Sequence, residues 1–191
     1  MAQGIILAGG YSSRIGQNKM GLLYQDIPLI HHCIRTMMPF VTEIFVVTGH
    51  YHQEISQLIS HMQNVTIIYN ECYPHGMFSS VLAGVRHVNA DFFILPGDYP
   101  IIKPKTYQLL LSSKKQIAVP NYQNKRGHPL FLKKELIIEL LKEPMESNLK
   151  CFRDRYEIDD IETDDPGILF DIDTLKDHND LIRKGVEPSG N

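Results

Sequence analysis

The glycine-rich stretch near the N-terminus contains the residue types that bind a chain of phosphates. It runs from Leu7 to Lys19 and reads Leu-Ala-Gly-Gly-Tyr-Ser-Ser-Arg-Ile-Gly-Gln-Asn-Lys. Glycines let the backbone approach a phosphate closely, and the free amides of such a turn point at an anion. Arg14 and Lys19 add the two positive charges that a triphosphate requires. The turn therefore predicts a nucleotide site, although Gly and Ser are also common in tight turns between a strand and a helix.

Two better-known nucleotide motifs are absent from this stretch. No Lys-Ser or Lys-Thr pair follows a glycine at the spacing of a Walker A loop, and the glycines do not follow the GxGxxG pattern. The second predicted strand ends in Thr48-Gly49-His50, without the acidic residue that holds a ribose in Rossmann oxidoreductases. These observations argue against a kinase and against a dehydrogenase.

Carboxylates follow two apolar runs later in the chain. Asp98 comes after residues 92–95, and Asp171 comes after residues 168–170, so each is expected at the carboxyl end of a strand. Ligands of open α/β sheets bind at that edge, and Mg²⁺ prefers one or two carboxylates together with phosphate oxygens and water. Asp173 is a third candidate, but N-capping of the last helix, by the following Thr174 or by Asp173 itself, would explain it equally well.

The elements that must position these residues alternate along the chain. Short apolar and often β-branched runs are separated by stretches of helical character, which is the rhythm of a mostly parallel sheet with helices on both faces. We therefore predict a single α/β domain with a Rossmann-like three-layer architecture. The predicted strands are residues 5–7, 44–47, 65–69, 92–95 and 117–119, and the predicted helices are residues 28–39, 53–62, 79–88, 105–113 and 134–142.

Composition limits the class of protein. The chain has 191 residues, of which 43% are hydrophobic and 21% are charged, and a formal net charge of −3. This suits one globular domain with no apolar window long enough for a membrane span, and the negative net charge argues against broad nucleic-acid binding. The three cysteines are widely spaced and indicate no disulfide framework, so we expect a cytoplasmic protein.

Beyond these residues, the chain resembles the molybdenum-cofactor nucleotidylyltransferases in five ordered blocks. The first is the glycine-rich turn, which matches Leu-Ala-Ala/Gly-Gly-x-Ser-x-Arg-Met-Gly-x-x-Lys with Ile15 in place of Met. The others are Gly-Met-Phe-Ser-Ser-Val-Leu-Ala-Gly at residues 76–84, Leu-Pro-Gly-Asp-Tyr-Pro at 95–100, Gly-His-Pro at 127–129 and Asp-Ile-Asp-Thr at 171–174. Five blocks in order are far more specific than any single one.

The resemblance implies a fold of the nucleotide-diphospho-sugar transferase type and a role for each block. Residues 1–186 would form the nucleotidyltransferase domain, with a nucleotide-binding half over residues 1–120, an acceptor-side region over residues 121–167 and a flexible tail at 187–191. Arg14, Lys19 and Asp98 would be catalytic, Asp98 and Asp171 would bind Mg²⁺ or Mn²⁺, and His128 would face the acceptor. Nucleotide binding would involve Leu7, Ala8, Gly9, Gly10, Ser12, Arg14, Lys19, Ser79, Ser80 and Asp98.

The implied reaction transfers a nucleotidyl group to a phosphorylated pterin-type acceptor, with a molybdoenzyme or its chaperone as a candidate partner. The turn Ala8-Gly9-Gly10 is closer to the guanylyl-transferring branch, whereas residues 77–83 and 127–129 look like the cytidylyl branch. The second match covers more positions, which favours CTP over GTP. Transfer to a sugar phosphate and a binding protein without turnover remain open. The paired histidines, His31-His32 and His50-Tyr51-His52, are interpreted as surface or capping residues.

Overall fold

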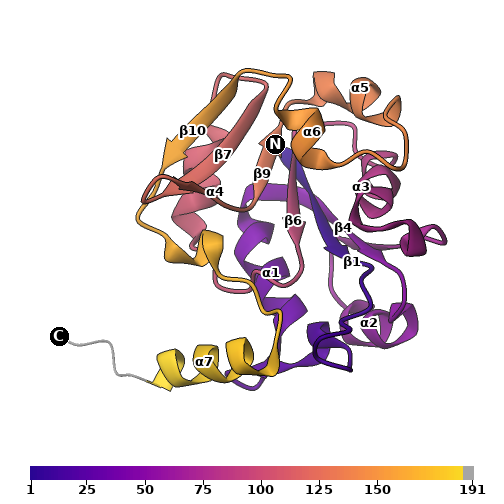
Figure 1. Ribbon diagram of the computed structural model, residues 1–191, viewed down its shortest axis with the longest axis vertical. Helices are drawn as coiled ribbons and strands as arrows, with labels where there is room; N and C mark the ends of the chain where they lie inside the picture. The colour runs from indigo at the N-terminus through magenta and orange to yellow at the C-terminus, as the bar shows by residue number, and fades with distance from the viewer. Residues whose placement is uncertain (187–191) are drawn as a thin grey trace.

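A single eight-stranded sheet forms the centre of the structure, which describes residues 1–186 of the chain in a computed structural model (Figure 1). The strand order is β10-β7-β9-β6-β1-β4-β5, and β8 pairs with β7 off this path. The predicted tail, residues 187–191, lies outside the described residues. The strands are β1 Ala2–Ala8, β4 Val41–Thr48, β5 Val65–Tyr69, β6 Phe92–Pro96, β7 Ile117–Tyr122, β8 Lys125–Arg126, β9 Leu130–Leu132 and β10 Ile158–Glu162.

Strand pairing confirms the predicted, mostly parallel sheet. β1 pairs in parallel with both β4 and β6, β5 pairs in parallel with β4, and β10 pairs in parallel with β7. β9 runs antiparallel between β6 and β7. Leu7 is in register with Val47 on one side and with Pro96 on the other, so the carboxyl ends of β1, β4 and β6 meet at one edge.

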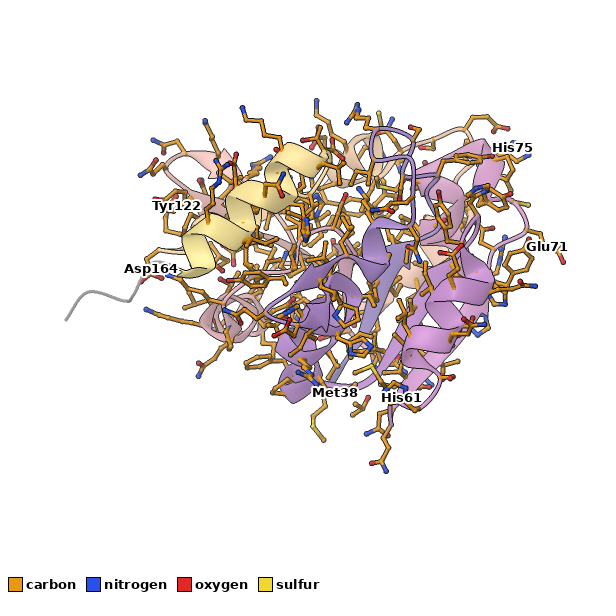
Figure 2. The ribbon with its side chains drawn as sticks, turned by 90° about the horizontal axis from the view of Figure 1, so that it is seen from below. Met38, His61, Glu71, His75, Tyr122 and Asp164 are labelled. Atoms are coloured by element: carbon orange, nitrogen blue, oxygen red, sulfur yellow. The ribbon has the colours of Figure 1, made fainter. Side chains whose placement is uncertain are left out.

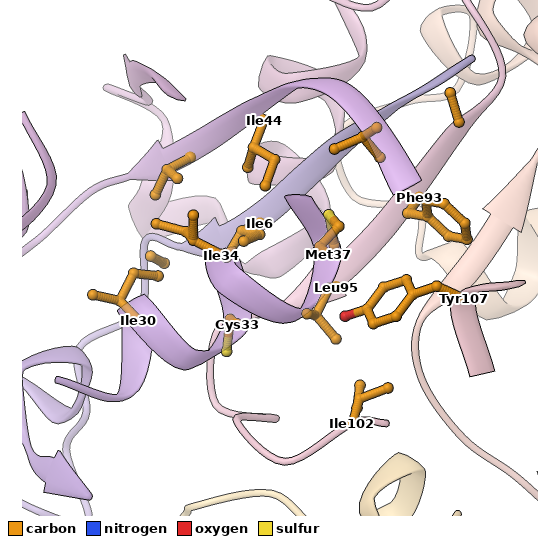
Figure 3. Packing of buried hydrophobic residues seen from close by; sticks show 14 of the residues in the cluster. Ile6, Ile30, Cys33, Ile34, Met37, Ile44, Phe93, Leu95, Ile102 and Tyr107 are labelled. Carbon is orange, nitrogen blue, oxygen red and sulfur yellow. The ribbon is translucent and has the colours of Figure 1, made fainter. Parts of the chain in front are cut away.

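Helices cover both faces of the sheet, as predicted. α1 Leu29–Met37, α2 His52–Ile59 and α4 Pro104–Leu111 pack on one face, where Cys33, Met37 and Tyr107 are fully buried (Figure 3). α3 Met77–Val85, α5 Ile137–Leu141 and α6 Leu149–Arg153 pack on the other face. Each fully buried large apolar side chain contributes about 1.5–3 kcal/mol, so the two cores hold the sheet rigidly beneath its carboxyl edge.

Short elements connect these layers. β2 Leu23–Tyr24 and β3 Ile27–Pro28 form a small hairpin before α1, and α7 Leu175–Val186 is the last helix. The 3₁₀ helices are η1 Lys19–Gly21, η2 Met38–Phe40, η3 Tyr73–His75, η4 Lys134–Leu136 and η5 Pro166–Leu169. Within residues 1–186, no helix has the length and apolar content needed to cross a membrane.

Two sequence-based expectations fail in the C-terminal part of the fold. The run at residues 168–170 is expected to end a strand, but the structure has the helix η5 there, because Pro166 fixes its start and the Asp165 side chain accepts a hydrogen bond from the Gly167 amide. The strand β10 lies in a segment with no predicted strand. It carries Asp159, Asp160 and Glu162 at the edge of the sheet, where charge replaces the apolar alternation that signals a strand.

Candidate active site

The glycine-rich turn follows β1 and contains its own local hydrogen bonds. Ser12 adopts a positive φ of 48°, and its carbonyl accepts from the amides of Ile15 and Gly16 at 3.0 and 2.9 Å. The Asn18 side chain caps η1 by accepting from the Met20 amide. The turn borders a cavity of about 300 Å³ whose lining includes Leu7, Ala8, Gly9, Gly10, Ser12, Lys19, Ser80 and Asp98.

Lys19 lies at the charged part of this cavity. Its Nζ donates to Asp98 Oδ2 at 2.6 Å and to the Ile172 carbonyl at 3.2 Å, and it lies 3.5 Å from Asp173 Oδ1. The Lys19 side chain is only 16% exposed. A largely buried ammonium therefore bridges the turn after β6 and the segment that precedes α7.

Three carboxylates converge beside this ammonium. Asp98, Asp171 and Asp173 offer oxygen atoms that all lie within 4.8 Å of one another. The Ile172 amide donates to the Asp98 carbonyl at 3.0 Å, which fixes the two segments together. Burial, followed by the nearby charges of Asp173 and Asp98, raises the pKa of Asp171 above its usual value.

The carboxylate cluster fits a hard divalent cation. The Oδ1 atom of Asp98 is buried and accepts no hydrogen bond from the protein. Buried polar atoms are normally paired, so an orphaned carboxylate oxygen in a group of three indicates a place for a positive ligand. Among the described residues, this cluster is the group of ligand-type side chains close enough to hold a metal ion, and no histidine belongs to it.

Arg14 lies at the outer edge of the site. Its Nη1 forms an ion pair with Asp173 Oδ2, and its side chain is 68% exposed. Arg14 and Lys19 thus both contact Asp173, although they leave the glycine-rich turn at different points. The structure brings the two predicted cations and the three predicted carboxylates into one network.

Ser79 and Ser80 are buried within α3 and do not cap it. The helix begins at Met77, and its N-cap is Gly76, without a side-chain capping bond. Both hydroxyl oxygens accept from Asn70 Nδ2, at 2.9 and 3.0 Å, and Ser79 Oγ also donates to the Gly76 carbonyl. Ser80 lines the cavity, and a methyl group on Gly9 would lie 2.8 Å from its hydroxyl oxygen.

His128 lies next to the turn that carries Asp98. Its ring packs against Tyr99 with the centroids 4.7 Å apart, and its amide donates to the Ile168 carbonyl at 3.0 Å. The Nδ1 atom is buried without a partner. Burial lowers the pKa of His128 to about 4, so the imidazole is neutral at pH 7.

The paired histidines elsewhere in the chain make local contacts. His31 Nε2 and His32 Nε2 lie 2.9 and 2.8 Å from the carbonyls of Leu58 and Tyr24. His52 Nδ1 lies 2.7 Å from the Thr48 hydroxyl. His31, His32 and His52 are thus partly buried and held by neighbouring groups, whereas His50 is exposed.

Sequence reasoning missed part of the cavity wall. The cavity is also lined by Tyr11, Tyr51, Tyr73 and Met77. The side-chain amide of Asn70 donates a hydrogen bond to the Ser80 hydroxyl and so positions it. Asn70 directly follows β5, so the rule that ligands gather at strand ends could have identified it. The tyrosines could not be found by the same rule. Tyr11 and Tyr51 lie in loops, and only the folded chain defines the path of those loops.

Together, these features can hold and polarise a nucleoside triphosphate. The glycine-rich turn borders the cavity, Lys19 and Arg14 offer positive charge, and the carboxylates offer metal ligands near them. A three-layer α/β fold with this arrangement at the strand ends defines a nucleotidyltransferase. Residues 4–160 match the MobA-like NTP transferase domain, and the chain belongs to this family.

Two relatives differ in the nucleotidyl group that their names specify. The chain is 30% identical over 178 residues to the molybdenum cofactor cytidylyltransferase of Escherichia coli (strain K12), covering 91% of each protein. It is 31% identical over 156 residues to a "probable molybdenum cofactor guanylyltransferase" of Bacillus cereus, covering 75% of this chain and 76% of that protein.

Solved structures share the fold. A nucleotidyl transferase from Methanothermobacter thermautotroptrophicus superposes with a TM-score of 0.81 at 20% identity, covering 96% of this chain and 99% of the other. A Mycobacterium tuberculosis protein solved in complex with manganese has a TM-score of 0.75 at 17% identity, covering 95% and 98%. The fold is therefore one that the nucleotidyltransferases of this type share.

Proposed function

We propose that the protein transfers CMP from CTP to the terminal phosphate of a molybdopterin-type molybdenum cofactor and releases pyrophosphate. The observation that carries this proposal is the network in which Lys19 bridges Asp98 and Asp173 at the edge of the cavity of about 300 Å³. A triphosphate in the glycine-rich turn would lie beside both the cations and the carboxylates. Family membership and the cytidylyltransferase relative support the same reaction.

The reaction needs no protein nucleophile. An oxygen of the acceptor phosphate attacks the α-phosphorus, the new P–O bond forms, and the bond to the β-phosphate oxygen breaks as pyrophosphate leaves. Lys19 and Arg14 stabilise the charge that builds on the β- and γ-phosphates. When bound at Asp98, Asp171 and Asp173, Mg²⁺, or Mn²⁺ in its place, supplies positive charge that neutralises the phosphates.

The acceptor belongs on the side of the sheet formed by β7, β9 and β10. His128 precedes β9 beside the Asp98 turn, and its unpartnered Nδ1 can accept or donate one hydrogen bond depending on the tautomer. Residues 121–167 would form the acceptor-side region and residues 1–120 the nucleotide-binding half. A cytoplasmic location and delivery of the product to a molybdoenzyme or its chaperone complete the proposal.

GTP is the second candidate nucleotide. The guanylyltransferase relative and the sequence Ala8-Gly9-Gly10 favour it, whereas the cytidylyltransferase relative matches a larger share of the chain. Two further reactions or roles use the same cavity: transfer to a different small phosphate, such as a sugar phosphate, and nucleotide binding without turnover. Base choice would depend on the pocket around Ser80, which Asn70 holds in a fixed position.

The test is a transfer assay with each of the four common ribonucleoside triphosphates. Purified protein, Mg²⁺ and the molybdenum cofactor or its metal-free pterin would be incubated, and both pyrophosphate and the dinucleotide product would be quantified. We expect the highest kcat/KM with CTP. Preferred use of GTP would select the guanylyl branch, and binding without pyrophosphate release under all conditions would contradict an enzymatic role.

A further inference from the structure

Three aromatic rings from separate segments meet on one side of the cavity. Tyr11 of the glycine-rich turn lies with its ring centroid 4.9 Å from that of His50 and 5.4 Å from that of Tyr73. His50 follows β4, and Tyr73 begins η3 after β5. Tyr11 and Tyr73 also line the cavity itself. We call Tyr11, His50 and Tyr73 the aromatic wall.

The aromatic wall is fixed to the floor of the cavity by the backbone. The His50 amide donates to the Gly9 carbonyl at 3.3 Å. Gly49 is packed so closely that a methyl group there would lie 2.6 Å from Tyr73 Cβ and 2.5 Å from the Gly9 carbonyl oxygen. A side chain larger than hydrogen at Gly49 would separate the wall from the glycine-rich turn. The rings therefore hold a defined position relative to the triphosphate site.

Two further observations point to a ligand for this wall. Tyr11 is 47% exposed, so its ring contributes little to the protein core and leaves an aromatic surface free. The wall lies by β4 and β5, at the other end of the sheet order from the acceptor-side strands β7 and β10. Figure 2 shows the same separation: Glu71, just before η3, and His75, its last residue, lie at one end of the molecule, and Tyr122 and Asp164 lie at the other. The wall is thus placed for the nucleotide and not for the acceptor.

We propose that Tyr11 and Tyr73 stack against the nucleobase and position it over Ser80, while His50 supports their rings from outside. This inference rests on the proposed function and adds two positioning residues to it. Every nucleobase has a π-face, so stacking raises affinity for pyrimidines and purines alike, and discrimination stays with the polar groups near Ser80. Because Tyr11 belongs to the glycine-rich turn, the same turn would contact both the base and the triphosphate.

The test separates the base from the phosphates. Isothermal titration calorimetry would compare CTP, GTP and inorganic tripolyphosphate, each with Mg²⁺ and without acceptor, on wild type, Tyr11→Leu, Tyr73→Leu and Tyr73→Phe. Tyr24→Leu is the matched control, because Tyr24 packs on His32 at 5.1 Å in the same tilted manner but does not line the cavity. Loss of one stacking partner raises a dissociation constant roughly ten-fold.

We expect Tyr73→Leu and Tyr11→Leu to weaken both nucleotides roughly ten-fold each, with tripolyphosphate, Tyr73→Phe and Tyr24→Leu close to wild type. Equal weakening of tripolyphosphate would overturn the inference, because it would show a distorted turn, and so would unchanged CTP binding. A wild type that binds none of the probes would overturn this inference and the proposed function together. If wild type binds CTP but transfers nothing, only the proposed function fails, and the variants still decide on the aromatic wall.

Discussion

Lys19 Nζ lies 2.6 Å from Asp98 Oδ2, so the cation expected to hold a triphosphate is paired with the carboxylate expected to hold a metal ion. The two residues are 79 positions apart in sequence. A nucleotide with its metal would redistribute these charges, because phosphate oxygens would take the ammonium and the cation would take the carboxylate. Without a nucleotide, the positive charge of Lys19 is therefore neutralised by the carboxylate of Asp98.

Removing the Lys19 charge should slow transfer strongly. We expect Lys19→Ala to lower kcat by roughly 10²–10³-fold, the usual effect of deleting a group that stabilises developing charge. Arg14→Ala should cost less, because Arg14 is 68% exposed and solvent screens its charge. Steady-state rates and melting temperatures of both variants would check this. Wild-type kcat in Lys19→Ala would remove Lys19 from the catalytic site.

The same pairing predicts a change in metal affinity in the absence of nucleotide. Lys19→Gln removes the positive charge beside Asp98, so Mn²⁺ should bind the free protein more tightly, by roughly ten-fold. Electron paramagnetic resonance of free Mn²⁺ would measure this. Lys115→Gln is the control, because that lysine pairs with Glu157 outside the carboxylate cluster. Weaker Mn²⁺ binding in Lys19→Gln would contradict the idea that the ammonium and the metal compete.

Asp98 should be more sensitive than Asp171 to loss of its charge. Asp98 contributes the orphaned oxygen and the partner of Lys19, so Asp98→Asn should nearly abolish turnover and lower Mn²⁺ affinity roughly ten-fold or more. Asp171→Asn should be milder, since burial already raises the pKa of Asp171 and disfavours its charge. Activity across a range of Mg²⁺ concentrations would separate the two variants. Normal activity of Asp98→Asn at low Mg²⁺ would exclude Asp98 from the metal site.

Gly9→Ala should act through Ser80. The new methyl group would lie 2.8 Å from Ser80 Oγ and would disturb the hydroxyl that Asn70 holds, so CTP affinity should fall. In a double-mutant cycle, Gly9→Ala with Ser80→Ala should cost less than the sum of the single changes, because both act on the same contact. Gly10→Ala is the control for folding, since its methyl group would have no neighbour within 4 Å. Additive effects on the dissociation constant would contradict the predicted coupling.

His128 should make stability depend on pH. Burial lowers its pKa to about 4 in the folded protein, whereas the unfolded chain has a pKa of about 6.5. The unfolded state therefore binds more protons between these values, so stability is full above about pH 6.5 and falls as the pH drops toward 4, by up to about 3 kcal/mol. Urea unfolding at several pH values should show a smaller decline for His128→Gln than for wild type. Identical declines would show that His128 is not buried in the neutral form.

The sequence by itself determined the scaffold and the inventory of charged residues. The β-branched runs fixed the strands β1, β4, β5 and β6, because such runs fit a buried parallel sheet and little else of that length. The glycine-rich turn and Asp98 followed from their positions after two of these strands. Local signals sufficed here, since a strand, a turn and the carboxyl end of each are properties of neighbouring residues.

Only the tertiary structure decided which of these residues meet. Arg14 and Asp173 are 159 positions apart, and Lys19 reaches the Ile172 carbonyl across 153 positions, so no local pattern records either contact. The same holds for Tyr11, His50 and Tyr73, whose rings converge because Gly49 allows two turns to pack closely. Asp171 follows the 3₁₀ helix η5 and not a strand, because Asp165 and Pro166 stabilise that helix. Two backbone hydrogen bonds, from the His128 amide to the Ile168 carbonyl and from the Ile172 amide to the Asp98 carbonyl, hold the segment in place.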